Sequence, residues 1–577
     1  MNCSGISLKL FLLMTFFAAS HILFGWQTTL AQKSQTETYI ETLTQADAKI
    51  SAKQWTEAAA LLEQIVKINP VEGKSWNRLA MAYYNAKDYR KSIPAYEKQI
   101  ELGYGIPANA AYNIACNYAL LGEKEAAIRW LEKAFAMGFP DLPNAQTDAD
   151  LKSLRDDSRY RNLVGLIDTS KMSREEGWRS DLQLLNREIK RKGYHLFPRT
   201  GTEADFDAAV KKLHDSIPQL TDGQIIVEMM KLMRKVGDGH TGLLGGRRAE
   251  FLQNLPVQFY LFEEGLFIIS TDPKYKDLLG AQVLKFGSRT PDEIVKGLEP
   301  IINRDNEIWI KQVATYRMRN LGLLNTLGLI PDASKISLTV RGLDGKERVV
   351  SLATDDTQPD IWNVKPNPAT WINLAQTLSA PAPLYLKNPA TPYWFEYLLD
   401  NKTVYFGFNS VRNDPKESLA DFTSRLFKFI NEKDVEKLVI DMRWNNGGNT
   451  MLLNPLVQGL IKNEKINRRG KLFVVIGRRT FSAAQNAATF IERYTNAIFV
   501  GEPTGSSPNF VGEEDPFTLP YSKLVMNVSD LYWESSFPQD RRTWIAPQIY
   551  LPPTFEAYRM NRDAALEAII NYKEKTN

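Results

Sequence analysis

Cysteine and histidine are scarce in this chain of 577 residues, which contains two cysteines and four histidines. Cys3 lies within the first thirty residues, and Cys116 is the single cysteine beyond them. The mature part of the chain therefore excludes an internal disulfide and a cysteine-based metal cluster. Cys116 lies in an apolar helical pattern, which is typical of a buried small hydrophobic residue. Nothing in the sequence implies a metal ion or an organic cofactor.

An excess of charge of one sign is also missing. The chain has 71 Lys and Arg residues against 67 Asp and Glu residues, which leaves a net charge of +4. This balance gives no reason to expect a nucleic-acid partner. The apolar fraction of 44% and the charged fraction of 24% are those of an ordinary globular protein. Because the chain is too long for one hydrophobic core, two to four domains are expected.

Long apolar runs are absent after the first thirty residues. Before that point, Lys9 precedes an apolar run from Leu10 to Trp26, and Thr29-Leu30-Ala31 then offers small residues to a signal peptidase. This layout predicts a cleaved secretory signal peptide over residues 1–31, and hence a periplasmic or secreted protein. The alternative is an uncleaved anchor, since the run is close to the ~20 residues that span a bilayer. Contact with a membrane is expected only in that case.

Residues 37–167 repeat themselves with a period near 34. Tyr89 follows Trp55 by 34 residues, and Trp130-Leu131-Glu132-Lys133 follows Ala95-Tyr96-Glu97-Lys98 by 35 residues. This region resembles tetratricopeptide repeats, in which paired helices bury large and small residues against the next pair. The resemblance implies a concave face that holds a peptide or protein partner. The alternative is a plain helical cap on the rest of the protein.

The middle of the chain divides into three segments. Residues 172–250 form a helical block that ends in the turn Gly237–Gly242, which is too rich in glycine to continue a helix. Residues 255–352 resemble a PDZ-like module, with a helical insertion from Asn303 to Leu329. PDZ modules bind extended C-terminal peptides as an added strand. Residues 353–400 are rich in Pro, Asn and Ala and are expected to form a linker or lid.

Residues 401–577 alternate between strand-like and helix-like patterns. The expected strands are Val404–Phe408, Lys437–Asp441 and Leu472–Ile476, and a helix is expected over Leu419–Ile430. Alternation of this kind predicts an α/β domain with an open sheet.

Three segments of this domain carry a family resemblance. They are Val439–Gly448, Arg479–Ala487 and Val500–Ser507. In order and spacing they resemble the C-terminal-processing (tail-specific) serine peptidases, and the resemblance extends over residues 172–577. It implies a catalytic domain of the ClpP/crotonase-like type. The expected fold class is therefore multidomain, with all-α tetratricopeptide-like repeats followed by an α+β and α/β peptidase region that includes the PDZ-like module.

Ser482 matches the position of the attacking serine in that family. It follows a buried strand and opens a helix, where the Ala483 N–H and the helix dipole favour negative charge. The N–H groups of Gly447 or Gly448, together with that of Ala483, would form the oxyanion hole. The alternatives are that Ser482 is a helix N-cap and that the glycine pair is an ordinary strand-to-helix turn.

The general base is where the sequence departs from the better-known branch of the family. That branch places a lysine 25 residues after the nucleophile, a position that holds Ser507 here, and the next lysine is Lys523. A serine hydroxyl is a weak nucleophile unless a base activates it. Another residue must therefore take the proton.

A histidine is the candidate for this role. Asp238-Gly239-His240-Thr241 resembles the motif of a second branch, in which a histidine replaces the lysine. Of the others, His21 lies in the signal segment, and His195 and His214 lie on polar helical stretches. An imidazole, with an unperturbed pKa near ~6.5, accepts a proton at neutral pH. The alternative is a structural or exposed histidine in a glycine turn.

A third group should orient His240. Asp540 falls where a related branch has its late acid, and Glu502 and Asp238 are rivals.

The sequence thus predicts an exported serine endopeptidase that cleaves polypeptides, with cleavage near C-termini implied by the resemblance. The alternatives are an inactive pseudopeptidase that binds polypeptide segments through its repeats and cleft, and a scaffold whose principal function lies in the repeats.

Overall fold

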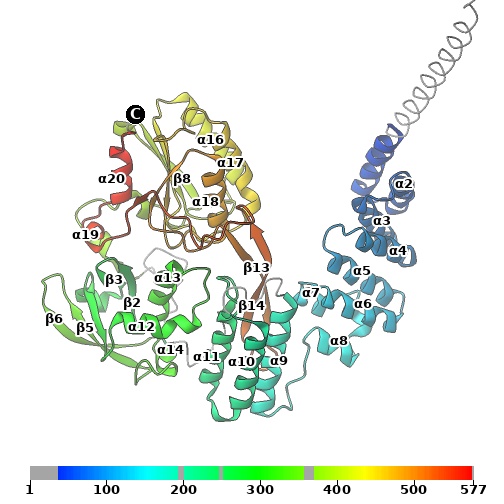
Figure 1. Cartoon of the computed structure of the whole chain (residues 1–577), viewed down its shortest axis with the longest axis horizontal. Helices are drawn as coiled ribbons and strands as arrows, with labels where there is room; N and C mark the ends of the chain where they lie inside the picture. Colours follow the sequence, from blue (N-terminus) through cyan, green and yellow to red (C-terminus); the bar gives the residue numbers. More distant parts are fainter. Residues whose placement is uncertain (1–36, 193–200, 246–250, 252, 356–369, 575–577) are drawn as a thin grey trace, which may run out of the picture. The chain divides into compact units, whose positions relative to one another are not determined.

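A computed structural model gives the structure of residues 37–192, 201–245, 251, 253–355 and 370–574. The chain divides into two compact units, the first ending at Asp168 and the second beginning at Thr169 (Figure 1). The expected signal peptide at residues 1–31 lies outside the described part. No helix that the structure describes has the length and apolar character needed to cross a membrane.

The first unit is helical. A helical stretch at residues 37–51 precedes α2 (Trp55–Ile68), α3 (Gly73–Asn85), α4 (Tyr89–Glu101), α5 (Pro107–Leu120), α6 (Lys124–Ala136), α7 (Leu142–Thr147) and α8 (Ser158–Leu163). Each helix from α2 to α6 packs against the next one along the chain. Buried alanines such as Ala59, Ala80 and Ala110 let neighbouring helices approach closely. The first six helices therefore form three stacked pairs, as the period near 34 predicts.

The second unit opens with three helices, α9 (Arg174–Lys192), α10 (Glu203–Ser216) and α11 (Asp222–Arg234). Thr202 and Thr221 begin α10 and α11 with capping boxes, which satisfy the first free N–H groups of each helix. Asp181 of α9 accepts hydrogen bonds from the N–H groups of Tyr521 and Ser522, each at 2.8 Å. The helical part is thereby joined to the C-terminal part of the same unit.

A three-stranded antiparallel sheet also joins these two parts. It contains β1 (Gly242–Gly245), β14 (Val525–Glu534) and β13 (Asn509–Thr518), in that order. Gly242 of β1 lies opposite Asn527 of β14. The expectation that residues 172–250 form only a helical block is corrected here. The sequence pattern missed β1 because the strand is 4 residues long and its partner lies near the other end of the chain.

A second sheet is formed by β2 (Val257–Phe262), β3 (Gly265–Thr271), β4 (Gln282–Phe286), β5 (Lys335–Arg341) and β6 (Glu347–Ala353), with β7 (Ile372–Asn373) beside β3. The helices α12 (Pro291–Leu298), α13 (Ile308–Arg317) and α14 (Leu321–Thr326) lie between β4 and β5. The expected helical stretch from Asn303 to Leu329 is confirmed, as two helices rather than one. The comparison of this region with a PDZ module stays a prediction.

The main sheet has the strand order β15-β12-β11-β10-β9-β8. Its strands are β8 (Tyr393–Leu398), β9 (Thr403–Phe408), β10 (Lys437–Asp441), β11 (Leu472–Ile476), β12 (Ile498–Gly501) and β15 (Ile549–Tyr550). All neighbours run parallel except the edge pair of β8 and β9. Every residue of β11 is buried, as expected for a parallel strand covered on both faces.

Helices cover both faces of this sheet. One face packs against α16 (Leu419–Glu432), α17 (Asn454–Lys462) and α18 (Ala483–Tyr494), and the other packs against α20 (Ala564–Asn571) (Figure 1). The short helices α15 (Leu374–Thr377) and α19 (Phe555–Tyr558) complete the unit. The chain is thus a helical repeat unit followed by a mixed α/β unit, which confirms the expected fold class.

The segment from 353 to 400, expected to be a linker or lid, is only partly described. Residues 356–369 lie outside the described part, and Tyr393–Leu398 is the edge strand β8 of the main sheet. The expectation is corrected for β8. Its aromatic residues Tyr393 and Phe395 pack against α16, which explains why this stretch is a strand rather than a linker.

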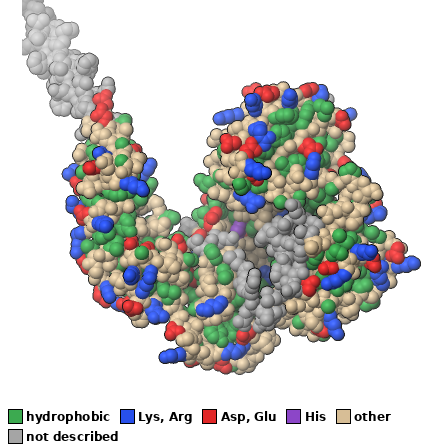
Figure 2. Space-filling view, turned by 180° about the vertical axis from the view of Figure 1, so that it is seen from behind, with side chains coloured by type: hydrophobic (Ala, Val, Ile, Leu, Met, Phe, Trp, Pro, Cys, Tyr) green, Lys and Arg blue, Asp and Glu red, His purple; other side chains and the backbone are tan. Residues whose placement is uncertain are grey.

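No strong charge of one sign gathers among the described residues on the face shown in Figure 2. On the face shown in Figure 2, the described Lys and Arg side chains are interspersed with Asp and Glu side chains. This distribution agrees with the small net charge of +4.

The chain divides into two compact units between Asp168 and Thr169, and the hydrophobic clusters described for the second unit consist of its own residues. We therefore expect a fragment of residues 169–577 to fold alone. Its thermal unfolding, followed by circular dichroism, should be cooperative, with a midpoint within about 2 °C of the same transition in the full chain. A fragment that unfolds without a cooperative transition would contradict this prediction.

Candidate active site

Ser482 lies in a strained turn between β11 and α18. Its backbone angles are φ 53° and ψ −129°, a combination that is rare for residues other than glycine. Its side chain makes no capping hydrogen bond to α18, so the alternative role of helix N-cap is wrong. A strained strand-to-helix turn is typical of a serine that presents its hydroxyl as a nucleophile.

Hydrogen bonds from the Thr480 hydroxyl and from the backbone connect this turn to the loop after β10. The hydroxyl of Thr480, which is fully buried, accepts a hydrogen bond from the Gly477 N–H at 3.1 Å and donates one to the Met442 carbonyl at 3.0 Å. The Phe481 N–H donates to the Asn445 carbonyl at 3.2 Å. The loop that carries Ser482 and the glycine loop are therefore held as one piece.

Gly447 and Gly448 have positive φ angles of 107° and 136°. A Cβ atom on Gly447 would lie 2.6 Å from the Cβ of Ser482, and one on Gly448 would lie 2.2 Å from the Val411 carbonyl oxygen. Both positions therefore need glycine for space as well as for conformation. Gly447 lies directly against Ser482.

The N–H groups of the glycine loop are not equivalent. The Gly447 N–H already donates to Oδ1 of Asn445 at 3.0 Å, so it is not available to an oxyanion in this conformation. In the described part of the chain, the N–H groups of Gly448 and Ala483 make no hydrogen bond. The predicted oxyanion hole is corrected accordingly, and the N–H groups of Gly448 and Ala483 remain as candidate donors to an oxyanion. Gly447 is the residue that lets the glycine loop approach Ser482 closely. Ala483 also opens α18, where the helix dipole favours negative charge.

A buried ion-pair network lies at the end of β10. Arg443 contacts Asp441 at 2.7 Å and Asp563 at 2.9 Å, and the Tyr405 hydroxyl donates to Asp441 at 2.7 Å. Burial raises the pKa of the Asp563 carboxyl, although Arg443 opposes this shift. The network connects the glycine loop to the residue that begins α20.

A second buried pair joins the ends of β11 and β12. Nε and Nη2 of Arg478 donate to the two carboxylate oxygens of Glu502 at 2.8 and 3.0 Å, and Nη1 donates to the Leu261 carbonyl at 2.8 Å. Burial alone would lower the pKa of the Arg478 guanidinium, but Glu502 raises it above its usual range. Because both carboxylate oxygens of Glu502 accept hydrogen bonds from Arg478, Glu502 is not the group that orients His240.

Asp238 shapes the backbone of the turn that carries His240. Its Oδ1 accepts hydrogen bonds from the N–H groups of His240 at 2.8 Å and Thr241 at 2.5 Å, and from the Ser529 hydroxyl at 3.2 Å. Ser529 belongs to β14, so the pairing of β1 with β14 brings this turn to the active-site region. No hydrogen bond joins Asp238 to the ring of His240, so this rival is also excluded.

The His240 ring is held by aromatic contacts. It stacks on Phe481, with 4.6 Å between ring centroids, and on Phe510 of β13, with 5.5 Å. Both ring nitrogens are buried and make no hydrogen bond to any group that the structure describes. His240 and Ser482 line the same pocket, of about 740 Å³, but no hydrogen bond connects them. The structure thus brings the two predicted residues to one site without joining them.

Asp540 does not orient His240 in this structure. Its carboxylate accepts hydrogen bonds from the Ser536 hydroxyl at 2.6 Å and from Arg542 at 2.8 Å, and it does not line the pocket. Arg542 and Ser536 lower the pKa of this carboxyl to about 2. The prediction of Asp540 as the third group is therefore corrected, because a neighbouring arginine holds the carboxylate locally.

Sequence reasoning missed Phe510 and Arg317. Phe510 follows from the β13–β14 hairpin, which the sequence pattern did not predict. Arg317 is the last residue of α13 and lines the same pocket as Ser482. A single arginine near the end of a helix is normally solvated, so the sequence contains no signal for its position.

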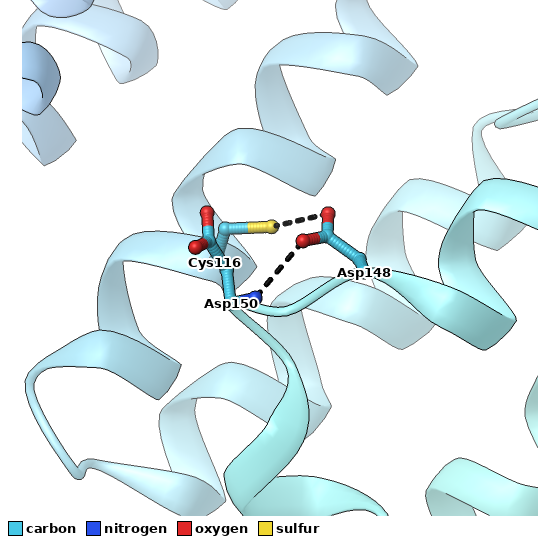
Figure 3. Close-up of side chains that lie close together, drawn as sticks. All are labelled: Cys116, Asp148 and Asp150. Carbon is cyan, nitrogen blue, oxygen red and sulfur yellow. Dashed lines mark hydrogen bonds between the residues drawn. The ribbon is translucent and has the colours of Figure 1, made fainter.

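One group of side chains in the first unit has the composition of a metal site, namely Cys116, Asp148 and Asp150 (Figure 3). The Cys116 thiol lies 3.7 Å from Oδ2 of Asp148, which also accepts a hydrogen bond from Tyr112 at 2.7 Å. Burial, with the two carboxylates, raises the pKa of the thiol well above its usual range. We assign these contacts to hydrogen bonding between α5 and the segment after α7, because the Asp148 carboxylate accepts from the Cys116 thiol and from the Asp150 N–H.

Comparisons with known proteins agree with the repeat architecture. A tetratricopeptide repeat family model matches residues 73–102 and 108–137, which are α3 with α4 and α5 with α6, so the repeats are confirmed. No curated protein matches the sequence.

Solved structures similar to the chain include mature CPAF, with 12% identity, 68% of this chain and 96% of that chain covered, and a TM-score of 0.47. The photosystem II D1 C-terminal processing protease has 12% identity, coverage of 68% and 99%, and a TM-score of 0.33. A putative peptidase from Parabacteroides merdae has 13% identity, coverage of 68% and 96%, and a TM-score of 0.34.

Replacing Glu502 by Gln should lower the free energy of unfolding by about 3–5 kcal/mol, because Arg478 would lose its charged partner while staying buried. Denaturant unfolding of both proteins measures the difference. Glu417→Gln is the matched control, since Glu417 forms an exposed bidentate pair with Arg425 and its loss should cost no more than about 1 kcal/mol. Equal losses in the two variants would contradict the role of the buried pair.

Replacing Gly447 by Ala should destabilise the protein by about 2–5 kcal/mol, the sum of a left-handed backbone penalty and a clash with Ser482. Gly287 also has a positive φ, of 60°, but a Cβ atom there would meet nothing within 4 Å. Gly287→Ala should therefore cost only about 1–2 kcal/mol. If urea unfolding gives the same loss for both variants, the close approach at Gly447 is not the constraint.

Proposed function

We propose that the second unit is a serine peptidase in which Ser482 is the nucleophile and His240 is the general base. One observation carries the proposal: Ser482 occupies a strained turn against Gly447, and its side chain shares a pocket with the His240 ring. Strain of this kind persists only where the surrounding structure holds it, and it concentrates at functional sites.

The proposed reaction is acyl transfer to serine and then to water. Oγ of Ser482 attacks the carbonyl carbon of the peptide bond while a ring nitrogen of His240 takes the hydroxyl proton. The N–H groups of Gly448 and Ala483 stabilise the oxyanion. His240 then gives the proton to the departing amine, and the C–N bond breaks. A water molecule hydrolyses the acyl ester by the same steps and restores the serine.

The support of the imidazole distinguishes this site from a serine–histidine–acid triad. Stacking on Phe481 and Phe510 holds the plane of the imidazole, a role that an acid has in a triad. Catalytic hydrogen bonds are often long or absent before substrate binds, and the proposal requires His240 and Ser482 to be joined in the complex with substrate.

The proposed substrate is a polypeptide outside the cytoplasm. Export rests on the signal-like segment at residues 1–31. Cleavage near C-termini rests on the resemblance to tail-specific peptidases. The tetratricopeptide repeats would hold a protein partner, since stacked helix pairs present an extended concave surface.

The second candidate function is polypeptide binding without cleavage. The observation that favours it is the absence of a hydrogen bond to either ring nitrogen of His240 among the described residues. A serine with no paired base is a weak nucleophile.

The test compares wild type with Ser482→Ala and His240→Ala on an unfolded protein substrate between pH 5 and 9. Both variants should lose activity by about 10³-fold or more. Wild-type activity should rise with pH within this range, because the base must be unprotonated to accept the proton. Initial rates of peptide release measure all three proteins.

The matched control is His214→Ala, because His214 is an exposed histidine on α10. It should cleave as the wild type does. Labelling with a fluorophosphonate separates the two functions, since an activated serine reacts with it and an inactive one does not. If the wild type neither cleaves nor is labelled, the proposed peptidase function is wrong and the unit is a binder.

A further inference from the structure

The catalytic pocket contains a cation that the proposed mechanism does not use. Arg317 ends α13 and lines the same pocket as His240 and Ser482. Apolar and aromatic side chains, among them Trp309 and Val313 of the same helix, line the pocket around it. Polar side chains such as Asn303 and Asn320 also line it, so the charge borders a pocket of mixed character.

Arg317 has no partner among the groups that the structure describes. Its guanidinium donates no hydrogen bond and forms no ion pair, and the side chain is partly buried. Burial lowers the pKa of Arg317 to about 10, so the side chain is still charged at neutral pH. A charge that is partly removed from water without compensation costs folding free energy, which a binding partner would offset.

Arg319, two residues further along the chain, shows the contrast. It is buried, and its Nε and Nη2 donate to the Leu255 carbonyl at 3.2 and 3.0 Å. Its guanidinium also lies over the ring of Trp371, at 5.1 Å from the centroid. Arg319 therefore has a structural role with protein partners, whereas the contacts of Arg317 are left to whatever enters the pocket.

The other charged groups of the pocket do not neutralise Arg317. The pocket lining that the structure describes contains one carboxylate, that of Glu513, which is exposed on β13 and forms no ion pair with Arg317. The remaining titratable groups that face the pocket are His240 and Tyr316. A ligand for Arg317 should therefore be an anion, and a guanidinium forms its strongest paired hydrogen bonds with a carboxylate or phosphate.

We propose that Arg317 binds a carboxylate of the polypeptide substrate and so directs cleavage to bonds near an acidic group. A polypeptide supplies this chemistry from two sources, the side chain of Asp or Glu and the free C-terminus. The apolar part of the lining, which includes Trp309 and Val313, strengthens the interaction because it lowers the local dielectric constant. The inference rests on the proposed function, since it assigns a substrate preference to that same pocket.

The experiment uses three peptides that differ only at one residue and at the C-terminal group. It compares the kcat/KM of the full-length protein for each peptide. One has an internal Asp and an amidated end, one has Asn at that position and a free C-terminal carboxylate, and one has Asn and an amidated end. Wild type should favour at least one carboxylate peptide over the uncharged peptide by about 10- to 100-fold. The favoured peptide identifies the source of the carboxylate.

Arg317→Gln should remove this preference and leave cleavage of the uncharged peptide within about 3-fold of wild type. Lys311→Gln is the matched control, because Lys311 is a cation on the same helix that does not line the pocket and pairs with Glu263 at 3.6 Å. It should keep the preference. Equal cleavage of all three peptides by wild type, or a preference that survives in Arg317→Gln, would overturn the inference.

Binding to Ser482→Ala separates this inference from the proposed function. Fluorescence anisotropy of the labelled peptides measures affinity in a protein that cannot use Ser482. Tighter binding of a carboxylate peptide, lost when Arg317→Gln is added, would support the anchor even if wild type cleaves nothing. Cleavage that requires Ser482 but ignores the carboxylate would contradict the role of Arg317 and leave the peptidase function standing.

Discussion

The geometry of the site depends on two buried arginine–carboxylate pairs at the carboxyl edge of the parallel sheet. Arg478 and Glu502 join the ends of β11 and β12, and Arg443 with Asp441 and Asp563 joins the end of β10 to the start of α20. Buried ion pairs gain little net stability because desolvation opposes their attraction. Their contribution here is positional, since the loops they hold carry the glycine pair Gly447 and Gly448 and the strained turn of Ser482. Ligands of open α/β sheets bind at this same edge.

The remaining parts of the pocket come from segments that lie far apart in the sequence. The turn of His240 reaches the site because β1 pairs with β14, and Phe510 of β13 completes the aromatic contacts of the imidazole. Arg317 comes from the helical insertion between β4 and β5. The strained backbone of Ser482 is therefore held in a pocket formed by several segments of the second unit, and its conformation depends on their joint packing.

Neighbouring arginines determine where two of the candidate carboxylates lie. Asp540 forms an ion pair with Arg542, and Glu502 forms one with Arg478. Neither carboxylate makes a hydrogen bond to the imidazole of His240. Among the residues that the structure describes, Arg317 has no such neighbour. Within the described part of the chain, the pocket therefore combines an imidazole without an acid and a guanidinium without a partner. This combination suits a substrate that supplies a carboxylate of its own.

The sequence alone determined the features that depend on local pattern. The period near 34 predicts the stacked helices, and the alternation of strand-like and helix-like patterns in residues 401–577 predicts an α/β domain with an open sheet. Ser482 and Gly447 were identified as candidate residues from short motifs. The tertiary structure decided which groups meet. It shows that the Gly447 N–H is used by Asn445 and that Asp540 is held elsewhere. Hydrogen bonds and ion pairs of this kind depend on distances between separate segments, and the order of residues along the chain contains no such distances.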